Sequence, residues 1–103
     1  MKRIISSPFA PKAVGPYSQA VEANGTLYIS GQLPIDPATG KMAEGIEAQT
    51  ARSLDNIRAI LEEAGYTLDD VVKSTVLLAD IADFGAMNAV YAKYYTKDMP
   101  ARV

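Results

Sequence analysis

The stretch YSQAVEANGTLYISG, at residues 17–31, predicts a β-hairpin. Its centre, Asn24-Gly25, is the strongest two-residue turn signal, because a type I′ turn needs a positive φ at both positions. The flanking segments, residues 18–23 and 26–30, are therefore expected to be antiparallel strands.

The segments next to this hairpin carry weaker signals. Residues 4–6 (IIS) predict a short edge strand, and three prolines and a glycine in residues 7–16 predict a loop. On the other side, Asp36-Pro37 and Gly40 supply turn chemistry for a loop at residues 31–41. The N-terminal part of the chain should therefore form strands joined by irregular segments.

Two amphipathic helices are expected in the rest of the chain. Apolar residues recur at helical spacing across residues 46–64, and Gly65 follows where a left-handed C-cap is common. This stripe consists of Ile46, Ala51, Leu54, Ile57, Leu61 and Ala64. A second helix should begin near Asp83, a suitable N-cap, and end before Pro100. Its expected buried stripe is Phe84, Met87, Val90, Tyr91 and Tyr94.

Residues 69–80 (DDVVKSTVLLAD) separate these helices and predict a strand apolar on both faces, hence central in a sheet. Residues 101–103 begin another extended segment. This order of elements predicts one α+β domain over residues 1–103, with two helices packed on one face of a mixed β-sheet. Two helices need a broad sheet to cover, so residues 101–103 should start a return to it.

Composition excludes several kinds of chemistry. The 103 residues contain no cysteine and no histidine, which removes disulfides, thiolate catalysis and the usual zinc ligands. The net charge of −2 gives no basic footprint, so nucleic acid is not expected as a partner. No apolar run approaches the roughly 20 residues of a membrane span, and no signal peptide opens the chain, so a cytoplasmic location is expected.

Five residues are candidates for a binding site, each with a plainer alternative. Arg102 follows Pro-Ala, which restricts the backbone and can pre-aim the guanidinium, and its fork of donors suits a carboxylate or phosphate. A solvated arginine is the plainer alternative. Ser30 and Gly31 end a strand, where a ligand can approach the glycine amide, or where the strand simply stops. Tyr17 could face a cleft or be a structural tyrosine. Asn88 needs partners if it is buried, and is otherwise a surface amide.

Several segments together resemble one family. In order along the chain, they are GPYSQA, LYISGQLPIDPATG, NIRAILEEAG, VVKSTVLLAD, FGAMNAVYAKYY and PARV. The chain resembles the RidA/YjgF family of reactive-intermediate (enamine/imine) deaminases essentially from end to end. Each segment is weak alone, whereas the set is highly specific.

The resemblance implies a chorismate-mutase-like fold and a homotrimer with ligand clefts between subunits. It also implies hydrolysis of reactive 2-imino acids, such as 2-iminobutanoate and 2-iminopropanoate, to 2-oxo acids and ammonia, without metal or cofactor. Arg102 matches the family arginine that grips the substrate carboxylate. Tyr17, Ser30, Gly31 and Asn88 match cleft-lining positions of the family.

The resemblance further implies a final segment with a glutamate that positions or activates water, and in many members a cysteine. Neither lies in these 103 residues, so the domain is expected to be cut short at its C-terminal strands, and no general base is assigned. A chain that ended at Val103 would be expected to fold poorly and to show little catalysis. Two alternatives stay open: a non-catalytic module that binds 2-oxo or amino acids, and the endoribonuclease or translation-inhibitor role of some family members. The acidic charge balance and the absence of histidine argue against the second.

Overall fold

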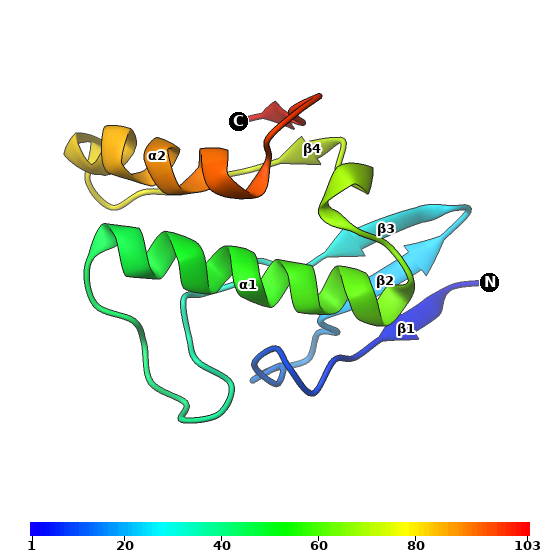
Figure 1. Ribbon diagram of the computed structural model, residues 1–103. Coiled ribbons are helices and arrows are strands. Elements are labelled where there is room, and N and C mark those ends of the chain that lie inside the picture. The colour runs from blue at the N-terminus through cyan, green and yellow to red at the C-terminus, as the bar shows by residue number, and fades with distance from the viewer.

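The predicted hairpin is present in the computed structural model, which describes residues 1–103. Strands β2 (Ala20–Ala23) and β3 (Thr26–Ile29) pair antiparallel. Asn24 and Gly25 join them with φ values of 52° and 76°, as the turn signal predicted. Strand β1 (Arg3–Ile5), one residue earlier than expected, pairs with the other edge of β2. A three-stranded antiparallel sheet results (Figure 1).

Helix α1 (Ile46–Ala64) has the bounds that the apolar spacing predicted. It ends at Gly65, whose φ of 90° places it in the left-handed region, as predicted for a C-cap. The helix packs on the three-stranded sheet through Ile60 and Ala64, which join Ile5, Ala10 and Ala20 in one core cluster. Burial of this apolar surface fixes the helix against the sheet.

Asn56 is the residue of α1 whose environment the sequence did not indicate. It is completely buried, and its Nδ2 donates hydrogen bonds to the carbonyl oxygens of Leu33 (3.1 Å) and Ile35 (3.0 Å). Its Oδ1 accepts hydrogen bonds from Nε and Nη2 of Arg52, one helical turn away. Asn56 therefore ties the loop after β3 to the middle of α1.

The long central strand predicted for residues 69–80 is not formed. Leu68–Asp70 is a 3₁₀ turn (η1), because Thr67 and Asp70 form a reciprocal capping box at its start. Only β4 (Lys73–Ser74) is a strand, and it pairs in parallel with β5 (Ala101–Arg102) in a separate two-stranded ladder. Val72 and Leu77 are largely exposed. Strand conformation depends on pairing, and this segment is paired by residues 101–103 on one edge only.

Helix α2 (Phe84–Tyr94) begins where expected, but its cap differs. Asp83 makes no capping hydrogen bond, whereas Asp80 accepts one from the Ala82 amide and caps the preceding 3₁₀ turn (η2, Ile81–Asp83). Met87, Val90 and Tyr91 are buried as predicted. Phe84 is exposed, with the guanidinium of the β5 arginine over its ring, and Tyr94 is only half-buried. Tyr95, just after the helix, is buried instead.

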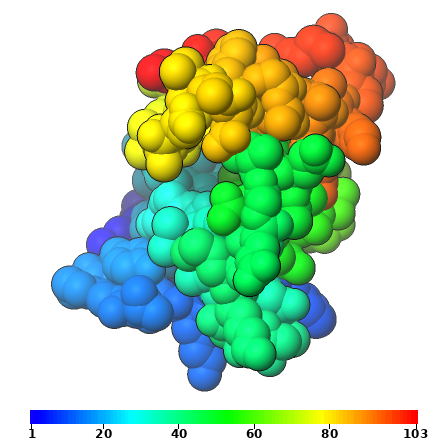
Figure 2. All heavy atoms as spheres, turned by 90° about the vertical axis from the view of Figure 1, so that its left-hand side faces the viewer, coloured from blue at the N-terminus to red at the C-terminus, as the bar shows by residue number.

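The two helices run beside each other and cover one side of the strands (Figure 1). In the space-filling view, α2 and the turn before it lie as a layer over α1 (Figure 2). Leu54 of α1 meets Met87, Tyr91 and Tyr95 in a second core cluster. The α+β class with two helices is thereby confirmed. None of the helices combines the length and apolarity that crossing a membrane would require.

A small polar cluster joins β1, β2 and the residue after the C-cap of α1. Glu22 accepts a hydrogen bond from Arg3 Nε at 3.0 Å and another from the Tyr66 hydroxyl. Nη2 of Arg3 donates a hydrogen bond to the carbonyl oxygen of Ala64 at 3.1 Å. The hydrogen bond from Arg3, followed by that from Tyr66, lowers the pKa of Glu22 below its ordinary value of 4.5. The hydrogen bond to Glu22 raises the pKa of Tyr66.

We expect this cluster to make stability depend on pH at the acid end. Because the pKa of Glu22 is lower in the folded chain, its contribution is complete above about pH 4.5 and is lost as pH falls through the folded pKa. Glu22→Gln should therefore flatten the acid part of a plot of urea midpoint against pH. Glu63→Gln, at an exposed glutamate without an ion pair, is the control and should leave the plot unchanged. A urea midpoint that falls equally with acid pH in Glu22→Gln and in the parent chain would contradict this account.

Candidate functional site

Arg102 is held in place by its backbone. In the β4–β5 ladder it lies opposite Ser74. The amides on either side are both fixed: Ala101 donates to the carbonyl of Val72 and Val103 to the carbonyl of Ser74, each at 3.0 Å. Pro100 restricts the chain just before the strand. The backbone of Arg102 is therefore well defined, as the sequence suggested.

The guanidinium of Arg102 lies on two aromatic rings. Its Cζ is 4.9 Å from the ring centroid of Tyr91 and 5.5 Å from that of Phe84, both on α2. These distances are within the range of cation–π attraction. Arg102 makes no salt bridge and no side-chain hydrogen bond within the chain; the chain's two ion pairs involve Arg3 and Arg58. Its N–H donors are therefore free to bind an anion.

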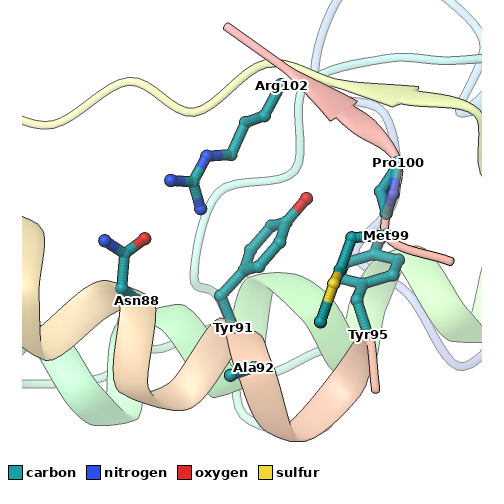
Figure 3. A pocket seen from close by; sticks show the side chains of 7 residues that line it. All are labelled: Asn88, Tyr91, Ala92, Tyr95, Met99, Pro100 and Arg102. Atoms are coloured by element: carbon teal, nitrogen blue, oxygen red, sulfur yellow. The ribbon is translucent and has the colours of Figure 1, made fainter. Parts of the chain in front are cut away.

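A cavity of about 380 Å³ opens beside this arginine, between α2 and the approach to β5. Its seven lining residues are Asn88, Tyr91, Ala92, Tyr95, Met99, Pro100 and Arg102. Arg102 reaches from β5 toward α2, and Asn88 lies one turn before Tyr91 on the same face of that helix (Figure 3). The cavity therefore joins one cation and one amide to a mainly apolar wall.

Asn88 is the second predicted site residue in this cavity. Its Oδ1 is buried and has no hydrogen-bond partner in the chain. An unpaired buried acceptor is uncommon, because desolvation without a hydrogen bond costs about 1–3 kcal/mol. Asn88 therefore carries an unsatisfied acceptor and is one of the residues that line the cavity.

The other three predicted residues do not line this cavity. Ser30 and Gly31 follow β3 and line a separate hollow of about 400 Å³ between β3 and β4, where the Ser30 hydroxyl donates to the carbonyl of Ser18 at 2.7 Å. Tyr17 is about half exposed, and its hydroxyl accepts a hydrogen bond from the Val14 amide of its own loop. Within one chain, the structure therefore brings together Arg102 and Asn88 and leaves Tyr17, Ser30 and Gly31 elsewhere.

Two tyrosines also line the cavity: Tyr91, which was expected only in the core, and Tyr95, which lies outside the predicted stripe. Tyr91 supports Arg102 with its ring, and Tyr95 lies next to it with ring centroids 4.6 Å apart. Burial, with a smaller contribution from Tyr91, raises the pKa of Tyr95 to about 12, so this phenol stays protonated at physiological pH. The helical spacing of Tyr91 predicted burial, and nothing in that spacing distinguishes a core tyrosine from one that also meets a cavity.

Arg102 also lines a smaller hollow of about 220 Å³, distinct from the two cavities described above. It is lined by Val76, Leu78, Ile81, Phe84, Met87, Arg102 and Val103. No carboxylate lines either of the two hollows that Arg102 lines. No group of three or more aspartates and glutamates is placed to hold a metal ion. Binding chemistry here is therefore that of a cation, an amide and aromatic rings.

Comparison with known proteins finds a matching family and similar sequences over almost the whole chain. The family described as Endoribonuclease L-PSP matches residues 8–103. A RutC family protein of Pyrococcus horikoshii is 55% identical over 104 residues, covering 100% of this chain and 82% of the relative. The 2-iminobutanoate/2-iminopropanoate deaminase of Capra hircus is 52% identical over 103 residues, covering 99% of this chain and 75% of the relative.

Solved structures agree with the sequence matches. RidA from the Antarctic bacterium Psychrobacter sp. has a TM-score of 0.95 and 46% identity, covering 98% of this chain and 82% of that chain. TdcF of E. coli, solved with bound serine, has a TM-score of 0.94 and 36% identity, covering 97% of this chain and 81% of that chain. These matches confirm the resemblance of the sequence segments and the fold that it implied. The chain belongs to the RidA/YjgF family.

Proposed function

We propose that this protein is a hydrolytic deaminase of small 2-imino acids. The observation that carries the proposal is the free guanidinium of Arg102, fixed at a cavity that also holds the unpaired Oδ1 of Asn88. A 2-imino acid offers a carboxylate to the first group and an N–H to the second. The proposal is supported by the deaminase name of the Capra hircus relative and by the bound serine, a small amino acid, in the E. coli neighbour.

The reaction adds water across a C=N bond. In RC(=NH₂⁺)COO⁻, the oxygen of water bonds to the imine carbon as the C=N π bond opens, and one proton moves from that oxygen to nitrogen. The C–N bond then breaks, and the second proton passes from the oxygen to the departing ammonia. The products are RC(=O)COO⁻ and NH₄⁺, so atoms and charge balance. Arg102 would hold the carboxylate in two-point geometry, and Asn88 Oδ1 would accept a hydrogen bond from the iminium N–H. The protonated imine is already a strong electrophile, so positioning supplies much of the rate gain.

We also propose that the site is completed by a neighbouring copy in a homotrimer. Tyr17, Ser30 and Gly31 lie away from the Arg102 cavity within one chain. A neighbouring subunit could bring its copies of these residues to the cavity. A native mass three times that of the chain is the expected result, and a monomer in solution at assay concentration would contradict it.

The activity is tested by following ammonia and 2-oxobutanoate from freshly generated 2-iminobutanoate. Both should appear in equal amounts and faster than in buffer. The 103-residue chain and a version extended by a family C-terminal segment are assayed side by side, and the difference in rate measures what that segment adds. A folded extended protein that binds 2-oxobutanoate without accelerating release would favour the binding-module alternative. Cleavage of RNA by the same preparation would favour the endoribonuclease alternative.

A further inference from the structure

Tyr91 connects the three elements that meet at the proposed site. It lies on α2 and is 8% exposed. Its hydroxyl is 2.6 Å from the hydroxyl of Ser74 on β4, and its ring lies 4.9 Å from the Cζ of Arg102 on β5. Ser74 is also the residue opposite Arg102 in the β4–β5 ladder. Tyr91 therefore contacts the side chains of two residues that are paired through the backbone of the β4–β5 ladder.

The packing around Tyr91 leaves its ring little freedom. The Tyr95 ring lies 4.6 Å away at an interplanar angle of 39°. Leu54 and Met87 complete the same core cluster. The hydroxyl is held by Ser74, whose own backbone is fixed by the amide of Val103. The ring is thus a rigid surface beneath a long, exposed arginine side chain.

Resting on the proposed function, we propose that Tyr91 is a positioning residue that orients Arg102 for the substrate carboxylate, with Ser74 fixing the tyrosine. The guanidinium lies over the Tyr91 ring and makes no hydrogen bond within the chain, so its N–H donors stay free for the two-point contact with a carboxylate. A side chain already ordered before binding loses less conformational freedom when the ligand arrives. Tyr91 should therefore act on ligand affinity and KM more than on kcat.

The test is a series of substitutions at position 91 that changes the ring electronics and little else. Tyr91→Phe keeps the ring but loses the hydrogen bond to Ser74, so it should bind 2-oxobutanoate more weakly than the parent protein and more tightly than a variant without the ring. Replacement of that phenylalanine by mono-, di- and trifluorophenylalanine progressively weakens the negative face of the ring, and affinity should fall stepwise. Tyr91→Leu removes the ring and should weaken binding about 5-fold, the size of an exposed cation–π contact. KM should follow the same order, with kcat changing less.

Helix α2 offers a matched control one turn along. The ring of Tyr94 carries Arg58 at 5.3 Å in the same manner, but Arg58 is engaged by Asp55 at 2.8 Å. Neither residue lines the cavities beside Arg102. The same fluorinated series at position 94 should leave the affinity for 2-oxobutanoate unchanged.

The outcomes separate this inference from the function on which it rests. Equal affinity across the fluorinated series at position 91, with Arg102→Ala still weakening binding, would overturn the positioning role alone. If Arg102→Ala binds and turns over like the parent protein, the proposed function fails. Ser74→Ala should weaken binding of 2-oxobutanoate in the parent protein but not in the Tyr91→Phe variant, if Ser74 acts through the tyrosine hydroxyl. Losses of binding free energy that simply add in the double variant would contradict the role of Ser74.

Discussion

Replacing Arg102 by alanine is expected to weaken binding of 2-oxobutanoate, the proposed product, about 100-fold, because two charge-assisted hydrogen bonds are lost. Arg102 is the only charged residue that lines the cavity, so no neighbour can replace it. Binding is measured by calorimetric titration at constant ionic strength. Since the side chain is exposed, the folded state should tolerate the substitution, and the urea midpoint should change little.

Two further variants test whether the lost affinity comes from the planar guanidinium of Arg102. Arg102→Lys keeps the charge but not the planar pair of donors, so it should bind about 10-fold more weakly than the parent protein. Arg58→Ala removes another arginine that lies on a tyrosine ring of α2 and should leave the affinity unchanged. If Arg102→Ala binds as tightly as Arg58→Ala, then Arg102 does not hold the carboxylate.

The second large effect is expected from Asn56→Leu, which should lower the free energy of unfolding by about 2–4 kcal/mol. Leucine has a similar size but cannot donate to the carbonyl oxygens of Leu33 and Ile35. It also removes the acceptor that Arg52 uses. The loss should appear as a lower urea midpoint with an unchanged denaturant slope.

Asn88→Leu is the matched control, since it too replaces an asparagine on a helix. Asn88 Oδ1 has no partner to lose, so the urea midpoint should remain close to that of the parent chain. Affinity for an N–H-bearing ligand should fall instead. Equal midpoints for Asn56→Leu and Asn88→Leu would show that the hydrogen bonds of Asn56 do not stabilise the fold.

Local signals accounted for the elements that the sequence predicted well. The Asn24-Gly25 turn and the helix over residues 46–64 are determined by residues close in sequence. The segment at residues 69–80 was predicted wrongly as a long central strand, because strand formation depends on a pairing partner that its own residues do not reveal. Asn56 was missed for a related reason: its carbonyl partners lie 23 and 21 residues away.

In the candidate site, too, local features were predicted and contacts between distant elements were not. Pro-Ala before Arg102 indicated a fixed backbone, and the ladder with β4 provides it. The direction of the side chain depends on Tyr91 and Phe84, which lie on a different element. Their periodicity indicated burial alone, so the aromatic surface under the arginine became visible only in the structure.

The central claim is that Arg102 directs the hydrolysis of a 2-imino acid. It is tested most directly by the initial rate of 2-oxobutanoate release from freshly generated 2-iminobutanoate, measured on the extended protein, its Arg102→Ala variant and its Arg58→Ala variant in parallel. The account predicts acceleration over buffer that Arg58→Ala retains and Arg102→Ala loses by about 100-fold. Equal acceleration by all three proteins, or none by a folded parent protein, would contradict it.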